Sequence, residues 1–249
     1  MAESYRYIGK DTPRKDGAEI VTGNAKYLDD IHFPNLLHGA ALRSPHPHAR
    51  IKRINKTKAR ALDGVEAVLT YRDVPDWTFG NPPIFRVLDR KVRYVGDPVA
   101  LVAAKTRELA REACGLIEVE YEVLAPVFDI DEAVKPGAPQ LYDEIPGNIL
   151  PLGDPILGPK SMTEIVMGDV KKGFKEADVV AEGTFGYENI PNPIPPESPG
   201  AVALWEEPSK VTVWVSNQAV YLNKIVLTAI FGDRVDVRTI GGPCGGSYG

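Results

Sequence analysis

Alternating hydrophobic and polar positions divide the first half of the chain into elements typical of an α/β unit spanning residues 37–134. The pattern of residues 65–70 predicts a strand. A short helix is expected before it, over residues 56–62, and Gly64 is expected to end that helix as a left-handed cap. The continuous apolar run 98–104 predicts a second strand, which should be buried on both faces.

A helix and a further strand follow this apolar run. Thr106 is a suitable N-cap for a helix that continues to about Leu116, because its side chain can accept a hydrogen bond from the first turn. In residues 117–123 apolar residues alternate with three glutamates, which predicts a half-buried strand. The glutamates are expected to form a solvated acidic face rather than a catalytic group: Glu118, Glu120 and Glu122. The order strand, helix, strand favours one α/β layer.

The second half of the chain shows a similar pattern from about Gly168 onward. Asp169 is expected to cap a helix through Ala177, and residues 179–188 resemble a strand. Four more elements are expected after these: two strands at 201–205 and 211–215 joined by a turn at 207–209, a helix at 219–231 and a strand at 235–240.

Composition narrows the class of protein. Apolar residues make up 43% and charged residues 25% of the chain, as in an ordinary globular protein. The net charge of −5 argues against nucleic acid as a main partner. No stretch approaches the roughly 20 continuous apolar residues of a membrane span, and the start lacks the apolar region of a secretory signal. We therefore expect a cytoplasmic protein.

Cysteine, proline and glycine content add two further expectations. Cys114 and Cys244 are too few for a disulfide framework, or for a zinc or iron–sulfur site supplied by this chain alone. Any redox metal should therefore depend on partners. The chain has 22 prolines and 23 glycines, and the proline-dense stretches 136–159 and 191–199 are expected to be long connections over a surface.

The last predicted strand runs directly into a nine-residue segment, 241–249, that contains five glycines. Backbone without side chains can approach a ligand closely, and its N–H groups can point at the oxygens of an anion. The glycines do not have the spacing of the dinucleotide fingerprint, and no lysine follows Gly246 as a phosphate loop requires. From composition alone, a flexible tail is an equally good interpretation.

Three blocks together identify a family. Residues 237–249 resemble the strand and glycine-rich Gly-Gly-Gly-Phe-Gly loop of the xanthine dehydrogenase/aldehyde oxidase molybdenum hydroxylases, with Tyr248 at the phenylalanine position. Residues 91–100 (KVRYVGDPVA) are similar to a second family segment. Residues 33–39 with 43–51 are similar to its opening block. The chain thus resembles the N-terminal part of the molybdopterin-binding subunit.

The resemblance implies a fold of the α/β (α+β) class, with an α/β hammerhead domain followed by the first part of a molybdopterin-binding domain. The implied boundaries are residues 1–135 for the hammerhead domain with its N-terminal arm, 136–165 for a proline-rich linker and 166–249 for the first portion of the molybdenum-cofactor-binding domain.

The resemblance also implies cofactor-binding residues: Gln218, Gly245, Gly246, Ser247, Tyr248 and Gly249. Gln218 ends a strand in the family pattern, where a neutral amide donor orients an oxygen ligand of molybdenum. The alternative for Gln218 is a cap of the following helix. Glu197 matches a recurrent family glutamate and is expected to be structural, accepting backbone N–H groups, although the proline density around it departs from the family. No catalytic residue or metal ligand is assigned to this chain.

The remaining candidates have structural interpretations. His46 and His48 flank Pro47 and could face one metal, but no third ligand is nearby, so structural or surface histidines are favoured. Cys244 is expected to fill the apolar side of the loop rather than to act as a reactive thiol.

The implied function is that of a subunit of a molybdenum hydroxylase that hydroxylates an N-heterocycle or aldehyde with oxygen from water. The implied cofactors are molybdopterin, in its simple or a dinucleotide form, and [2Fe-2S] clusters and FAD on partner subunits. Because residue 249 lies inside the loop, we expect a split molybdenum subunit whose second half is a separate polypeptide, alongside an iron–sulfur subunit, a flavin subunit and a small-molecule substrate. A fragment of a longer gene is the alternative. Two other functions stay open: a non-catalytic docking subunit, and a related enzyme of ring reduction or hydration.

Overall fold

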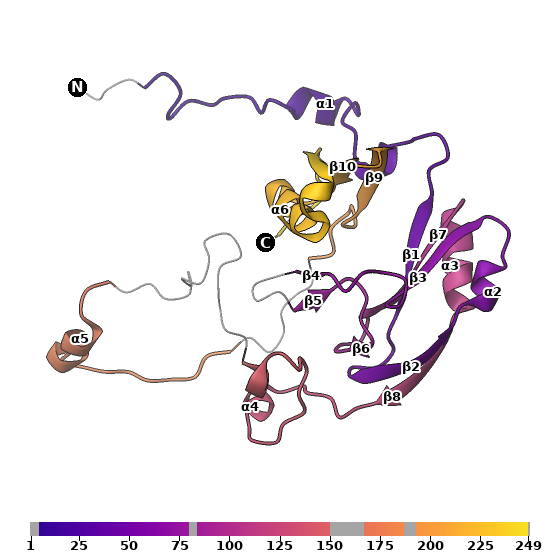
Figure 1. Cartoon of the computed structure of the whole chain (residues 1–249). Helices are drawn as coiled ribbons and strands as arrows, with labels where there is room; N and C mark the ends of the chain where they lie inside the picture. Colours follow the sequence, from indigo (N-terminus) through magenta and orange to yellow (C-terminus); the bar gives the residue numbers. More distant parts are fainter. Residues whose placement is uncertain (1–4, 80–83, 150–166, 187–192, 249) are drawn as a thin grey trace. The chain divides into compact units, whose positions relative to one another are not determined.

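A computed structural model describes residues 5–79, 84–149, 167–186 and 193–248 (Figure 1). The chain forms two compact units. One comprises residues 34–186, here called the hammerhead unit, and the other comprises residues 1–33 together with 187–249, here called the loop unit. The N-terminal 33 residues therefore group with the C-terminal segment, whereas the sequence places them as an arm of the first domain. The predicted boundaries at 135 and 165 stay a prediction.

The hammerhead unit contains a three-stranded antiparallel sheet in the order β1 (His38–Arg43), β7 (Pro98–Ala104) and β3 (Val65–Thr70). The central strand β7 buries four residues completely or nearly so, as its continuous apolar run predicted: Val99, Ala100, Val102 and Ala104. The helix α3 (Arg107–Gly115) contacts β1 and β7 and buries Ala110, Ala113 and Cys114. Its N-cap Thr106 accepts the N–H of Leu109 at 3.1 Å, as expected.

A second antiparallel sheet has the order β6 (Lys91–Val92), β2 (Ala49–Asn55) and β8 (Glu118–Val123). The expectation of one α/β layer is therefore wrong. Strands β7 and β8 flank α3 in sequence but lie in different sheets, because each pairs with an earlier strand, β1 or β2, instead of with the other. The glutamate side of β8 is exposed as predicted, and Glu118 pairs with Lys58 at 2.6 Å.

Short elements complete this unit. The predicted helix before Gly64 is α2 (Thr57–Arg60), and Gly64 has a φ of +85°. The remaining described elements are β4 (Thr78–Phe79), β5 (Phe85–Arg86), α4 (Ile130–Ala133), the 3₁₀ turn η2 (Pro146–Asn148) and α5 (Val170–Glu176). Asp169 caps α5 as expected, accepting the N–H of Lys172 at 3.0 Å.

Two expectations about the region after residue 135 need comment. Residues 136–149, expected to lie in the linker, belong to the hammerhead unit and contact earlier residues of it; Asn148, for example, donates to the carbonyl of Ala133 at 2.9 Å, and Lys91 donates to that of Gln140 at 2.7 Å. The strand expected at 179–188 is wrong for residues 179–186, which form no strand. A strand requires a neighbouring backbone for its N–H and C=O groups, and none pairs with this segment in the described chain. Residues 187 and 188, like 150–165, lie outside the described residues.

The loop unit is built on a sheet in the order β11 (Asp236–Gly241), β10 (Lys210–Val215) and β9 (Ala201–Glu207). Strands β9 and β10 form the predicted antiparallel hairpin, and β11 runs parallel to β10. The helix α6 (Val220–Phe231) makes the connection that a parallel pair requires. Its residues Val220, Leu227 and Phe231 pack on a core of four valines: Val211, Val213, Val215 and Val237.

The loop unit also holds α1 (Gly17–Val21), η1 (Leu28–Asp30) and η3 (Gly232–Arg234). Among the described residues of both units, no helix is long and apolar enough to cross a bilayer.

Candidate cofactor-binding loop

The glycine-rich segment after β11 lies close to its own chain on one side. A Cβ added at Gly241 would lie 2.4 Å from Val220 Cγ2. At Gly245 it would lie 2.3 Å from Glu197 Cβ, and at Gly246 it would lie 2.5 Å from Pro195 Cβ. Distances below about 3 Å leave no room for a side chain. These glycines are therefore required by intramolecular packing, in addition to any ligand.

Glu197 fixes this loop, in agreement with the structural role expected from the sequence. Its Oε2 accepts the backbone N–H of Gly245 at 2.7 Å and the hydroxyl of Ser216 at 2.6 Å. Its Oε1 accepts the backbone N–H of Leu28 at 3.0 Å. Burial by itself would raise the pKa of Glu197, but the bonds from Ser216, Gly245 and Leu28 outweigh it and lower the pKa. The carboxylate is therefore held in its charged form.

Gln218 and the loop are brought together across 29 residues of sequence. The hydroxyl of Ser247 donates to Gln218 Oε1 at 2.6 Å, and the Gln218 amide nitrogen has no acceptor among the residues that the structure describes. The helix-cap alternative for Gln218 is not observed, because the N-cap of α6 is Ala219 and no side chain caps this helix among the described residues. Asn217 Oδ1 accepts the N–H of Ala219 and the side-chain amide of Asn223, both at 2.9 Å.

The other predicted site residues lie on the same segment. Tyr248 is 62% exposed and Ser247 is also exposed, whereas Gly245 and Gly246 are half-buried. Gly249 lies outside the described residues. Within the part of the chain that the structure describes, the backbone N–H groups of Gly246, Ser247 and Tyr248 meet no protein acceptor. These donors suit the oxygens of an anionic pterin–molybdenum group. The N–H of Gly245, by contrast, is used by Glu197.

Sequence reasoning missed two contributors to this site. Ser216 is 3% exposed and reaches Glu197, and the N-terminal segment supplies the N–H of Leu28. Ser216 directly follows the predicted strand 211–215 and directly precedes Asn217 and Gln218, so its position in the sequence was a usable signal. Leu28 contributes only a backbone group, and no sequence pattern reports such a contact.

Cys244 and the two histidines have local partners. The Cys244 thiol is half-buried and donates to the carbonyl of Gly246 at 3.2 Å. His48 is 3% exposed, and its Nδ1 lies 2.6 Å from the carbonyl oxygen of Ala125. The ring of His46 packs edge-on against Tyr121 at 4.9 Å. Cys244 and His46 thus have contacts within the chain, whereas the second ring nitrogen of His48, Nε2, is buried without a hydrogen-bond partner among the described residues.

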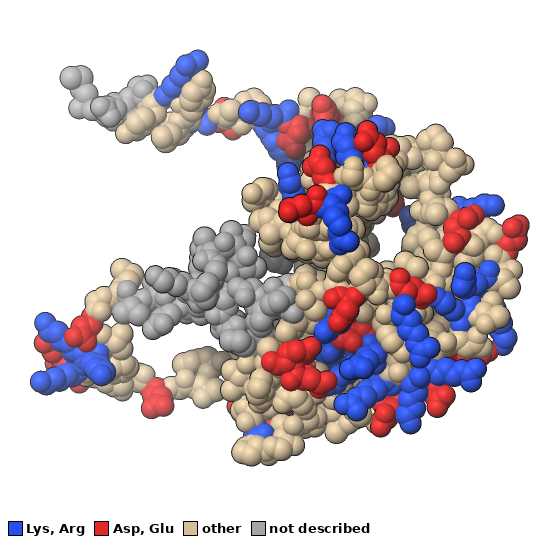
Figure 2. All heavy atoms as spheres, viewed as in Figure 1, with Lys and Arg blue, Asp and Glu red and all other residues tan. Residues whose placement is uncertain are grey.

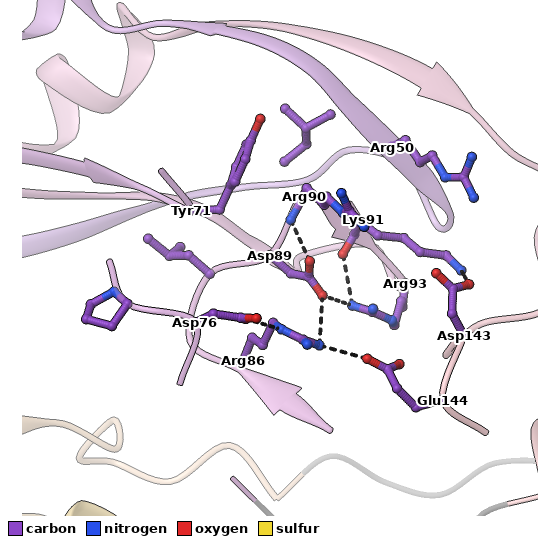
Figure 3. Close-up of a pocket in the computed structure, with 13 residues that line it drawn as sticks. Arg50, Tyr71, Asp76, Arg86, Asp89, Arg90, Lys91, Arg93, Asp143 and Glu144 are labelled. Carbon is purple, nitrogen blue, oxygen red and sulfur yellow. Dashed lines mark hydrogen bonds and ion pairs between the residues drawn. The ribbon is translucent and has the colours of Figure 1, made fainter. Parts of the chain in front are cut away.

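The hammerhead unit carries a separate charged cavity of about 790 Å³ that the sequence did not reveal (Figure 3). Arg86 pairs with Asp76 at 2.6 Å and Glu144 at 3.2 Å, and Arg93 pairs with Asp89 at 2.8 Å. Cations and carboxylates are likewise interspersed on the face of this unit that Figure 2 displays. The described carboxylates of the cavity are thus engaged by its cations.

Part of this network binds the segment that follows the hammerhead strands. Lys91, whose side chain is 6% exposed, donates to the carbonyl of Gln140 at 2.7 Å and pairs with Asp143 at 3.1 Å. Arg93 donates to the carbonyl of Leu141 at 3.0 Å and stacks over Tyr142 at 4.2 Å. The arrangement acts as a clamp on residues 140–143.

Comparison with known proteins places both halves of the chain. Residues 22–125 match the model of the aldehyde oxidase and xanthine dehydrogenase a/b hammerhead domain, and residues 156–249 match that of the molybdopterin cofactor-binding domain. The chain is 36% identical over 244 residues to a probable xanthine dehydrogenase subunit of Bacillus subtilis, covering 95% of this chain and 30% of that protein.

Two further relatives agree. The chain is 33% identical over 256 residues to the nicotinate dehydrogenase large molybdopterin subunit of Eubacterium barkeri, covering 100% of this chain and 56% of that protein. The crystal structure of quinoline 2-oxidoreductase from Pseudomonas putida 86 superposes with a TM-score of 0.75 at 27% identity, covering 96% of this chain and 30% of that one. The chain therefore spans between about a third and somewhat more than half of these relatives.

These matches confirm the expected fold class and the order of hammerhead and cofactor domains. The chain belongs to the xanthine dehydrogenase and aldehyde oxidase family of molybdenum hydroxylases, as an N-terminal part of the molybdopterin-binding subunit.

Proposed function

We propose that this chain forms one side of the molybdopterin site in an oxidoreductase that hydroxylates an N-heterocycle or an aldehyde, using water as the oxygen source. One observation carries the proposal: Gln218 and Ser247 meet at 2.6 Å although 29 residues separate them. The strand end and the glycine loop thus present their donor groups from one place. The match to the cofactor-binding domain model over residues 156–249 supports the same cofactor.

The chain's own contribution is binding and orientation. Gln218 would offer its amide nitrogen to an oxygen of the cofactor, and the backbone N–H groups of Gly246, Ser247 and Tyr248, together with Gly249, would hold further oxygens. Neutral donors stabilise charge on an oxygen without bringing a titrating group to the metal. When bound, the molybdenum cofactor supplies the redox chemistry of the hydroxylation. Gly245 would contribute indirectly, because its N–H is taken by Glu197.

We further propose that the complete assembly contains the rest of the molybdenum subunit, an iron–sulfur subunit with [2Fe-2S] clusters and a flavin subunit with FAD, and that it is cytoplasmic. Xanthine, nicotinate and quinoline, which appear in the names of the three relatives, are N-heterocycles. These names support the substrate class.

The direct test is analysis of the protein purified with its native partners. We expect molybdenum, a fluorescent pterin after oxidation, and copurifying polypeptide that carries the later cofactor motifs. Turnover is then measured with a dye acceptor on xanthine, nicotinate, quinoline and an aromatic aldehyde. A natively assembled protein that contains neither pterin nor molybdenum would refute the proposal and favour the docking-subunit alternative.

Gln218→Ala tests the residue-level assignment. We expect turnover to fall by about 10²-fold, the scale for losing one oriented donor, while the molybdenum content changes little. Gln218→Glu is the matched variant, because it keeps the shape of the side chain but replaces its donor with a charged acceptor. It should be as impaired as Gln218→Ala. Unchanged turnover in Gln218→Glu would show that no amide donor is used there.

A further inference from the structure

We infer that Glu197 is a positioning residue that locks the glycine-rich loop to the N-terminal segment 25–33, here called the N-terminal strap. The inference rests on the proposed function, since it assigns to the strap and to Glu197 the placement of the loop that would hold the cofactor. It makes residues 25–33 part of the cofactor site, although in sequence they directly precede the hammerhead strands.

Three segments of the chain converge on one carboxylate. Ser216, directly after β10, and Gly245 in the loop both donate to Oε2, at 2.6 and 2.7 Å, and Leu28 in the strap donates to Oε1 at 3.0 Å. Hydrogen bonds to a charged group are roughly twice as strong as those between neutral groups. One side chain therefore cross-links elements that lie 169, 19 and 48 residues away in sequence.

The strap also contacts β10 and the glycine loop through residues other than Leu28. Phe33 packs on Trp214 of β10, with ring centroids 5.2 Å apart. A Cβ at Gly242 would lie 3.3 Å from the carbonyl oxygen of Lys26, and a Cβ at Gly200 would lie 2.6 Å from a methyl of Leu28. Ala25 is 7% exposed. The strap thus contacts the strand before Gln218 and the first turn of the glycine loop.

Because the two carboxylate oxygens of Glu197 accept from different segments, its variants should release different segments. A glutamine has one acceptor oxygen and one donor nitrogen. If its oxygen takes the Oε2 position, Ser216 and Gly245 keep an acceptor, and the amide nitrogen then faces the N–H of Leu28. Glu197→Gln should consequently release the strap more than the loop, whereas Glu197→Ala should release both.

The experiment is hydrogen exchange followed by mass spectrometry on the protein purified with its native partners. In Glu197→Ala we expect exchange about tenfold or more faster than wild type in peptides covering 243–248 and 25–31, the scale for losing hydrogen bonds to a charged group. Peptides covering the core strand 211–215 should be unchanged. In Glu197→Gln the increase should be concentrated in 25–31. Glu207→Gln, at an exposed position of β9, is the matched control and should alter neither.

The outcomes separate this inference from the proposed function. Wild-type exchange rates at 243–248 in a folded Glu197→Ala protein would overturn the inference. If Glu197→Ala also speeds exchange in the core strand 211–215, the result for Glu197→Gln becomes the test. An exchange rate at 25–31 that is unchanged in Glu197→Gln would then overturn the inference. Pterin and molybdenum content are measured on the same samples, and their absence from wild type would count against the proposed function while leaving the exchange result as it stands.

Discussion

Replacing Gly245 by alanine tests whether the glycine loop is held by packing against Glu197. The new methyl group would lie 2.3 Å from Glu197 Cβ and 3.1 Å from its backbone nitrogen, where ordinary contacts begin at 3.4 Å. The obstructing atoms belong to the backbone and the base of a side chain, so no flexible chain end can turn away. Overpacking of this kind costs about 1–3 kcal/mol. For a unit of about 100 residues, each kcal/mol lowers Tm by roughly 4–8 °C.

The assay is thermal unfolding followed by tryptophan fluorescence, since Trp205 and Trp214 both belong to the loop unit. Two matched variants grade the effect. Gly242→Ala would approach the carbonyl oxygen of Lys26 at 3.3 Å and should cost less than about 1 kcal/mol. Gly17→Ala has its nearest neighbour at 3.6 Å and should be within about 0.5 kcal/mol of wild type. If Gly245→Ala is as stable as Gly17→Ala, the loop is not packed as described.

Two further predictions concern the hammerhead unit. Burial raises the pKa of Asp73, but hydrogen bonds from Lys56 and Thr70 outweigh it and lower the pKa from 3.8 to about 2. The ionised Asp73 therefore adds about 2 kcal/mol to the free energy of unfolding. This stabilisation is complete above pH 3.8 and is lost as the pH falls toward 2. Asp73→Asn should remove this stabilisation at pH 7, so the free energy of unfolding, measured with denaturant, should change less between about pH 4 and 2 than in wild type. Asp63→Asn, at an exposed position, should behave as wild type. A loss of stability in acid as large as that of wild type in Asp73→Asn would contradict the role of Asp73. Lys91→Ala removes the bonds to Gln140 and Asp143, so it should lower the free energy of unfolding by about 2 kcal/mol and speed proteolysis at residues 139–148. Lys52→Ala, at an exposed position, is the control. Equal rates of cleavage in the two variants would exclude the clamp.

The sequence predicted most individual elements because they depend on local patterns. The strands predicted at 65–70 and 98–104 have the same bounds in the structure, and Thr106 and Asp169 cap the helices that the sequence predicted after them. Apolar periodicity and capping chemistry act over a few residues, so both can be read directly. The family resemblance supplied the domain order, which local patterns do not contain.

Pairing over long distances was not predictable in the same way. Nothing local indicates that β7 and β8 belong to different sheets, or that residues 179–186 find no strand partner in the described chain. The three donors to Glu197 include two backbone groups, whose N–H is common to every residue except proline. Likewise, no local pattern indicates that α6 begins after Ala219 without a side-chain cap, so that Gln218 is not used as one.

The central claim is that the backbone donors after Gly245 face a bound pterin cofactor. Hydrogen exchange at residues 246–248 should be compared between the native assembly and the same assembly produced without molybdopterin. We predict at least about tenfold slower exchange at these amides when the cofactor is present, with the β10 strand unchanged. Equal exchange in the two preparations, with pterin demonstrably present in the first, would contradict the account.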